Sequence, residues 1–146
     1  MSYIQMANTV TILGTKYSID EVSGTTEPRM EDSFGCCDYG SKEILLNNQY
    51  DNEEGNTKSY DKFKRTTLRH EITHAFCNEG GNFGNEMLNN EIVTDWVAHI
   101  SPKLFIAFLK AGALDPDTLE EIGEIITNDY DDDFVFINQS SKKISN

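Results

Sequence analysis

Arg69-His70-Glu71-Ile72-Thr73-His74-Ala75-Phe76 is the segment from which we infer both the fold and the function of this chain. Residues four apart lie on one face of an α-helix, so His70 and His74 can direct their imidazoles toward one metal ion. Glu71 is rotated by about 100° around the helix axis, and from there its carboxylate can reach a water on that ion. The opposite face is apolar, which predicts that it is buried: Leu68, Ile72, Ala75 and Phe76.

A catalytic zinc ion needs a third protein ligand, because such sites combine three protein ligands with one water. The segment Asn90-Glu91-Ile92-Val93-Thr94-Asp95-Trp96 offers Glu91 and Asp95, which share one face of a second predicted helix. We assign Glu91 as the third ligand and Asp95 as the acceptor for the free ring N–H of a ligating histidine. Glu86 in the preceding connector, or Asp95 itself, is an alternative third ligand. The other face of this helix is predicted to be buried: Ile92, Val93, Trp96, Val97 and Ile100.

Several other polar residues are weighed against this site. His99 lies about 12 Å from Glu91 along the helix, so the two cannot bind one ion, and we expect a surface or packing residue. Glu79 follows the histidines on the same helix and cannot fold back to them. Either Tyr39 or Tyr130 is a candidate donor to an oxyanion, and the sequence selects neither.

H-E-x-x-H followed by N-E-x-x-T-D resembles the gluzincin metallopeptidases, whose pattern is H-E-x-x-H followed by N-E-x-x-S-D. Within that group, the chain is most similar to the small ImmA/IrrE-like metallopeptidases of phages and mobile elements. The resemblance covers roughly the middle half of the chain. Four segments carry it: Cys37–Tyr39, Lys42–Leu46, Arg69–Phe76 and Asn90–Trp96.

This resemblance implies a zinc metallopeptidase. His70, His74 and Glu91 carry over as zinc ligands. Glu71 carries over as the general base that activates the zinc-bound water, and Asp95 as the orienting carboxylate. The implied reaction is hydrolysis of peptide bonds in a peptide or protein substrate, by a regulatory protease of a phage or mobile element.

The resemblance also implies a fold. We expect an α+β, zincin-like domain in which a small antiparallel or mixed N-terminal sheet packs on the active-site helix, followed by a helical C-terminal half. In zincins the strand preceding the active-site helix is commonly an edge strand that binds an extended substrate, and this role would fall to Lys42–Leu46. An ordinary strand within the sheet is the alternative.

Two other functions compete with peptide hydrolysis. One is a catalytically silent zinc-binding protein on the same scaffold, although a structural zinc site has no need of a base at Glu71. The other is an acidic interaction protein, for example one that imitates DNA to block a DNA-binding partner, which the net charge of −13 suggests.

The composition narrows the class of protein. The 146 residues favour one domain, 1–146, with loose ends at about 1–8 and 140–146. Because 25 acidic residues outnumber 12 Lys and Arg, we expect neither nucleic acid nor an anionic membrane surface as a partner. We recognise no secretory signal and no apolar run near the roughly 18 residues of a membrane span. Three cysteines, two of them adjacent, do not suggest a disulfide framework, so we expect a reducing cytoplasm. We also expect a monomer.

Local patterns predict the order of the elements. Four strands are expected, at Thr9–Leu13, Lys16–Val22, Cys36–Tyr39 and Lys42–Asn47, with turns at Gly14–Thr15 and Gly40–Ser41. Four helices should follow: from a cap at Ser59 to about Asn78, from Asn89 or Asn90 to about Ile100, from Ser101-Pro102 to Ala111, and from Asp115-Pro116 to about Asp129. A last short strand is expected at Phe134–Ile137.

Overall fold

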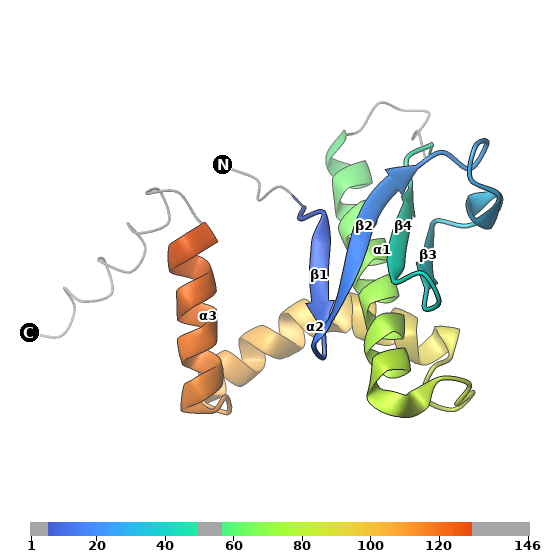
Figure 1. The fold of residues 1–146 in the computed structure, drawn as a ribbon. Helices are drawn as coiled ribbons and strands as arrows, with labels where there is room; N and C mark the ends of the chain where they lie inside the picture. Colours follow the sequence, from blue (N-terminus) through green and yellow to red (C-terminus); the bar gives the residue numbers. More distant parts are fainter. Residues whose placement is uncertain (1–5, 50–56, 130–146) are drawn as a thin grey trace, which may run out of the picture. The chain divides into compact units, whose positions relative to one another are not determined.

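The computed structural model describes residues 6–49 and 57–129 and has an α+β fold, a small mixed sheet followed by three α-helices (Figure 1). The strands are β1 (Thr9–Ile12), β2 (Thr15–Val22), β3 (Gly35–Asp38) and β4 (Glu43–Asn47). The α-helices are α1 (Thr57–Cys77), α2 (Glu91–Ala111) and α3 (Pro116–Asp129), with a short 3₁₀ helix η1 (Pro28–Met30) and a π-helical turn η2 (Asn78–Asn82). The α+β class is therefore confirmed. The strand expected at Phe134–Ile137 lies outside the described residues.

The order of the strands in the sheet is β1-β2-β4-β3. β4 pairs in parallel with β2 and antiparallel with β3, so β4 is an inner strand and β3 is an edge among the described strands. The edge role expected for Lys42–Leu46 is therefore wrong, and the alternative of an ordinary inner strand holds. The consecutive residues Ile44, Leu45 and Leu46 are all buried, as is usual for a strand covered on both faces.

The two hairpin turns differ in how well they were predicted. Ile12 pairs with Thr15, so the first turn is Leu13–Gly14 rather than Gly14–Thr15. Both central residues have positive φ, 46° and 86°, which is the conformation of a two-residue type I′ turn. The second turn contains Gly40–Ser41 as predicted.

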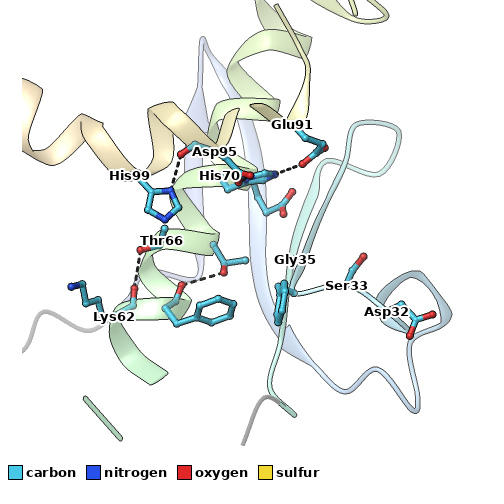
Figure 2. A pocket seen from close by; sticks show the side chains of 13 residues that line it. Asp32, Ser33, Gly35, Lys62, Thr66, His70, Glu91, Asp95 and His99 are labelled. Carbon is cyan, nitrogen blue, oxygen red and sulfur yellow. Dashed lines mark hydrogen bonds and ion pairs between the residues drawn. The ribbon is translucent and has the colours of Figure 1, made fainter. Parts of the chain in front are cut away.

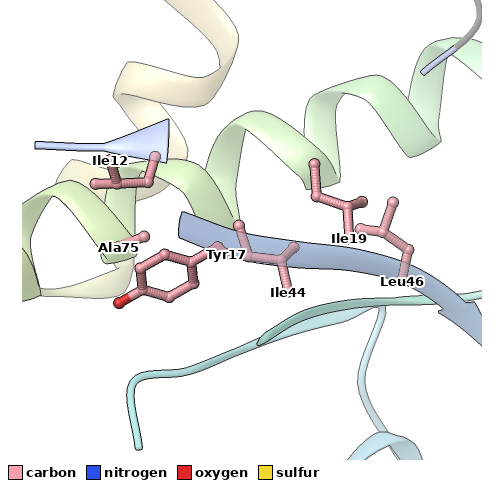
Figure 3. Close-up of a cluster of buried hydrophobic side chains, with 6 residues drawn as sticks. All are labelled: Ile12, Tyr17, Ile19, Ile44, Leu46 and Ala75. Carbon is pink, nitrogen blue, oxygen red and sulfur yellow. The ribbon is translucent and has the colours of Figure 1, made fainter. Parts of the chain in front are cut away.

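α1 packs its apolar face against the sheet. The core cluster consists of Ile12, Tyr17, Ile19, Ile44, Leu46 and Ala75 (Figure 3). Ile72 packs against it one turn before Ala75 on the helix, and Leu68 two turns before. Phe76, predicted for the same face, is 45% exposed, because the next residue along a helix is rotated by about 100°.

α2 is one continuous helix that includes Pro102, so the predicted break at Ser101-Pro102 is wrong. A proline inside a helix leaves the carbonyl four residues earlier without its N–H partner. Here that carbonyl, of Ala98, accepts a hydrogen bond of 2.6 Å from the Nε of Arg69 on α1. A side chain from another helix thus replaces the missing backbone donor.

The predicted buried face of α2 is also wrong. Ile92 is 83% exposed and Trp96 is 59% exposed, whereas Thr94 and Ala98 are buried. Hydrophobicity alone therefore selected the wrong face of this helix.

The chain divides into two compact units, residues 1–101 and 102–146. The first unit contains the sheet, α1 and the first half of α2, and the expectation of one domain over the whole chain stays a prediction. Among the described residues, α2 is the one helix with the length and apolar composition of a membrane span. One such helix is weak evidence for a membrane span. The first turns of α2 carry Glu91 and Asp95, whose carboxylates contact His70 on α1.

Candidate metal centre

The candidate site forms where the second half of α1 meets the first turns of α2 (Figure 2). Among the described residues, His70, His74 and Glu91 form a group whose ligand atoms all lie within 4.8 Å of one another, and this group could hold a metal ion. The Nε2 atoms of the two histidines are 3.1 Å apart. Glu91 places its carboxylate oxygens 3.0 Å from Nε2 of His70 and 3.2 Å from Nε2 of His74. The three predicted ligands therefore come together.

Hydrogen bonds at the far side of each ring fix the histidine tautomers. Nδ1 of His70 lies 2.7 Å from Oδ1 of Asp95, and a carboxylate only accepts, so Nδ1 carries the hydrogen. Nδ1 of His74 lies 2.7 Å from Oδ1 of Asn89, whose Nδ2 donates to Oδ1 of Asn78 at 2.9 Å. Both Nε2 atoms therefore present lone pairs to each other.

The two Nε2 lone pairs and the negative charge of the Glu91 carboxylate thus meet at one point, with no hydrogen-bond donor between them. A cation between the three groups would balance this charge and accept the lone pairs. Ligands of a tetrahedral ion with bonds of 2.0–2.1 Å are about 3.3 Å apart. The two Nε2 atoms are 3.1 Å apart, and each lies near a different Glu91 oxygen, His70 at 3.0 Å from Oε2 and His74 at 3.2 Å from Oε1. The residues present thus fit a metal ion in number, in chemistry and in spacing.

Glu71 lies beside this group but is buried, with 6% of its surface exposed. Burial raises the pKa of Glu71 to about 8, the charge of Glu91 adds to the rise, and the backbone N–H of Cys37 opposes it. An acid with a pKa near neutrality can both accept and return a proton at physiological pH. The position beside the metal group, rather than within it, is the one predicted for the base.

Gly35 on β3 provides the space for the Glu71 carboxylate. A Cβ at position 35 would lie 2.6 Å from Oε1 of Glu71 and 2.8 Å from Cγ2 of Thr67. Any side chain there would displace the carboxylate or push the strand away from α1. The sequence offered no signal for this requirement, because Gly35 is far from the motif along the chain.

The remaining candidates take other positions. Asp95 orients His70 rather than joining the group of three, and Glu86 is exposed in the connector outside that group. The Nδ1 of His99 donates to the backbone carbonyl of Asp95 at 2.8 Å, which ties its ring to its own helix. Tyr39 lines a pocket together with the candidate metal group, whereas Tyr130 is outside the described residues.

Glu79 binds the sheet instead of the metal group. Its carboxylate accepts hydrogen bonds from Thr15 Oγ1, Tyr17 OH and Lys42 Nζ. The expectation that Glu79 does not reach the histidines agrees with this arrangement. These bonds tie η2, which directly follows α1, to the first hairpin and to the turn before β4.

Asn89 is the residue of the site that sequence reasoning assigned differently. It was one of two candidates for the helix cap, but its side chain orients His74. Asn90 supplies the cap, since its Oδ1 accepts from the backbone N–H of Val93 at 2.9 Å. Two adjacent asparagines before the helix were the only signal, and the sequence could not divide these two roles between them.

Comparisons of the chain with protein-family models, with curated proteins and with solved structures find no significant match. The fold and the site therefore define the class of this chain by themselves: an α+β protein with a His-His-Glu group that could hold a metal ion.

Proposed function

We propose that this protein is a zinc-dependent metallopeptidase, a hydrolase with a zincin-like domain that cleaves a peptide or protein substrate. One observation carries the proposal: two imidazole lone pairs and the Glu91 carboxylate converge next to the buried carboxylate of Glu71. The resemblance of both helix motifs to the gluzincins, and to ImmA/IrrE-like proteins in particular, supports it and favours a regulatory role.

The donor set favours a transition metal such as zinc over magnesium or calcium. Imidazole nitrogen suits zinc and other transition metals, whereas magnesium and calcium prefer oxygen ligands. Catalytic zinc sites keep three protein ligands and leave a fourth position for water or substrate. His70, His74 and Glu91 would be those three ligands.

In the proposed mechanism the zinc ion acts as a Lewis acid and Glu71 transfers the proton. A zinc ion held by His70, His74 and Glu91 would supply Lewis acidity, which acidifies water and polarises a carbonyl group. Glu71 accepts a proton from the attacking water as the new C–O bond forms. Glu71 then delivers that proton to the amine nitrogen as the C–N bond breaks. Asp95 and Asn89 hold the two imidazoles in the tautomer that binds a metal.

The edge strand β3 is suited to bind an extended substrate beside this site. The backbone N–H of Asn47 donates to the carbonyl of Phe34. Since antiparallel pairs alternate, Cys36 and Asp38 also direct their backbone groups to β4, whereas Gly35 and Cys37 direct theirs outward, where the N–H of Cys37 donates to the Glu71 carboxylate. Outward groups on an edge strand can pair with an added strand.

The test compares two variants with the wild type. Glu71→Gln should keep its fold and its zinc but lose at least about 10²-fold in hydrolysis, the usual contribution of a general base. His70→Ala should lose zinc. Zinc is measured by atomic emission on protein purified without added metal, and hydrolysis by mass spectrometry of a digested peptide mixture. Undiminished cleavage by Glu71→Gln would remove the proposed role of Glu71.

The net charge of −13 favours a second candidate, an acidic protein that binds a basic partner without cleaving it. Such binding would depend on the acidic surface rather than on the metal group. It should therefore survive both the His70→Ala substitution and removal of metal by a chelator. Loss of binding in both cases would exclude this candidate.

A further inference from the structure

Two aromatic pairs stand at the two ends of the edge strand β3. Phe34 directly precedes the strand and packs edge-to-face on Phe63 of α1, with ring centroids 4.8 Å apart. Tyr39 directly follows the strand and stacks on Phe83, with ring centroids 5.0 Å apart. In each pair, one ring belongs to the end of β3 and the other to α1 or the segment that follows η2.

Each aromatic pair lines a pocket that reaches the candidate metal group. The Phe34 pocket is lined by Phe34, Phe63, Thr66, His70, Glu71 and Glu91, with further residues around them. The Tyr39 pocket is lined by Tyr39, Phe83, His74, His70, Glu71 and Glu91, again among others. Because both pockets share His70, Glu71 and Glu91, they form one cleft with the metal group between its two aromatic ends.

The aromatic ends combine a fixed position with apolar surface that is partly exposed. The Nζ of Lys42 lies 3.6 Å from the centroid of the Tyr39 ring, a cation–π contact that holds this ring against Phe83. Phe83 is 67% exposed, and Phe34 and Phe63 are 48% and 41% exposed. Large apolar side chains with this exposure on both sides of a polar site are typical of subsites for apolar groups.

The distance between the two aromatic pairs along β3 can be expressed as a number of residues in an extended polypeptide. Phe34 and Tyr39 are five residues apart, which corresponds to about 16 Å of strand. A substrate strand paired with β3 would pass both pairs within about five of its own residues. Since Gly35 and Cys37 meet Glu71 between the two pairs, the reacting bond would lie near the middle of that segment.

On the basis of the proposed function, we infer that the substrate is an extended protein segment with a bulky apolar side chain on each side of the cleaved bond. Each apolar side chain lies about two to three residues from that bond. One side chain packs on Phe34 and Phe63, and the other on Tyr39 and Phe83. The site thus selects its substrate from both sides of the bond, through two pairs of aromatic rings.

The test uses a synthetic peptide library, zinc-loaded protein and identification of the cleaved bonds by mass spectrometry. Wild-type protein should favour Phe, Tyr, Leu or Met on both sides of the cleaved bond. Phe63→Ala should lower the preference on one side by about 10-fold, the effect of a lost apolar contact in a specificity pocket, and Phe83→Ala should lower it on the opposite side. The matched control is Phe76→Ala, because Phe76 is 45% exposed on α1 and lines neither pocket.

A second readout separates this inference from the proposed function. Immobilised Glu71→Gln protein should retain library peptides with two apolar residues about five positions apart, and adding Phe63→Ala to it should abolish the retention of those peptides. Cleavage without an apolar preference, or equal effects of Phe63→Ala and Phe76→Ala, would overturn the inference and leave the peptidase standing. Retention of such peptides without cleavage by the wild type would overturn the peptidase and leave a peptide-binding cleft. Neither cleavage nor retention would overturn both.

Discussion

At the scale of single residues, the candidate site depends on how each histidine is held. Asp95 is a charged acceptor for His70, whereas Asn89 is a neutral acceptor for His74 and is itself held by Asn78. A carboxylate behind an imidazole raises the basicity of the ring more than an amide does. We therefore expect the two rings to contribute unequally to metal affinity, with His70 the stronger ligand.

Replacing Asp95 by Asn tests this difference. Asparagine keeps the hydrogen bond to Nδ1 of His70 but removes the negative charge, so zinc affinity should fall by about 10–100-fold. Affinity is measured by competition with a chromophoric chelator. Glu86→Gln is the control, and it should bind zinc as the wild type does. A larger loss in Glu86→Gln than in Asp95→Asn would make Glu86 the third ligand.

At the scale of secondary-structure elements, the distance between β3 and α1 controls the position of the general base. The Glu71 carboxylate occupies the space that a Cβ at position 35 would need. None of the three metal-group residues is among the nearest contacts of that space. The spacing of strand and helix is therefore expected to affect proton transfer without affecting metal binding.

The substitution Gly35→Ala separates these two properties. It should leave zinc affinity unchanged but lower the rate of hydrolysis by about 10²-fold, because a carboxylate displaced by about 1 Å transfers a proton poorly. Overpacking should also lower the free energy of unfolding by about 1–3 kcal/mol. Gly80→Ala is the matched control, since its nearest contact would be an ordinary 3.8 Å to Leu13. Equal activity of the two variants would contradict the argument.

The continuity of α2 through Pro102 is another contact between elements, since Arg69 on α1 donates to the carbonyl of Ala98. Arg69→Met should lower the free energy of unfolding by about 1–3 kcal/mol, because the carbonyl of Ala98 loses its donor. In a Pro102→Ala background this loss should shrink, since the restored N–H at position 102 can bond that carbonyl. A double-mutant cycle by urea unfolding measures the coupling. Strictly additive losses would show that the two residues act independently.

At the scale of the whole molecule, the stability of this acidic chain depends on pH through its paired carboxylates. Lys42, then Tyr17, lowers the pKa of Glu79 below its usual range, and the hydrogen bond from Arg29 does the same for Glu27 and Glu43. A carboxyl group with a lower pKa in the folded state binds protons more weakly there than in the unfolded state. Its contribution is complete above the unfolded pKa of about 4.5 and is lost as the pH falls through the folded pKa.

Glu79→Gln tests this pH dependence. At pH 7 the variant should unfold at a lower urea concentration than the wild type, because the ionised carboxylate no longer accepts from Lys42 and Tyr17. Below about pH 4.5 the difference should shrink, since the wild-type carboxyl group becomes protonated. Unfolding is followed by circular dichroism at several pH values. The exposed Glu120→Gln on α3 is the control, and a difference that grows in acid would reverse the sign of the argument.

Local spacing in the sequence was enough to predict the pairs His70 with His74 and Glu91 with Asp95. It also predicted four strands followed by helices, apart from the break placed at Pro102. These features depend on residues two to four positions apart, whose relative placement a helix or strand determines by its own geometry. Only the tertiary structure decided that β3 is the edge strand, that Gly35 makes room for Glu71, and that Asn89 orients His74. It also decided that α2 passes through Pro102, because Arg69 supplies the missing donor. Each of these depends on contacts between residues that are far apart in the chain, and no local pattern records which distant residues will meet.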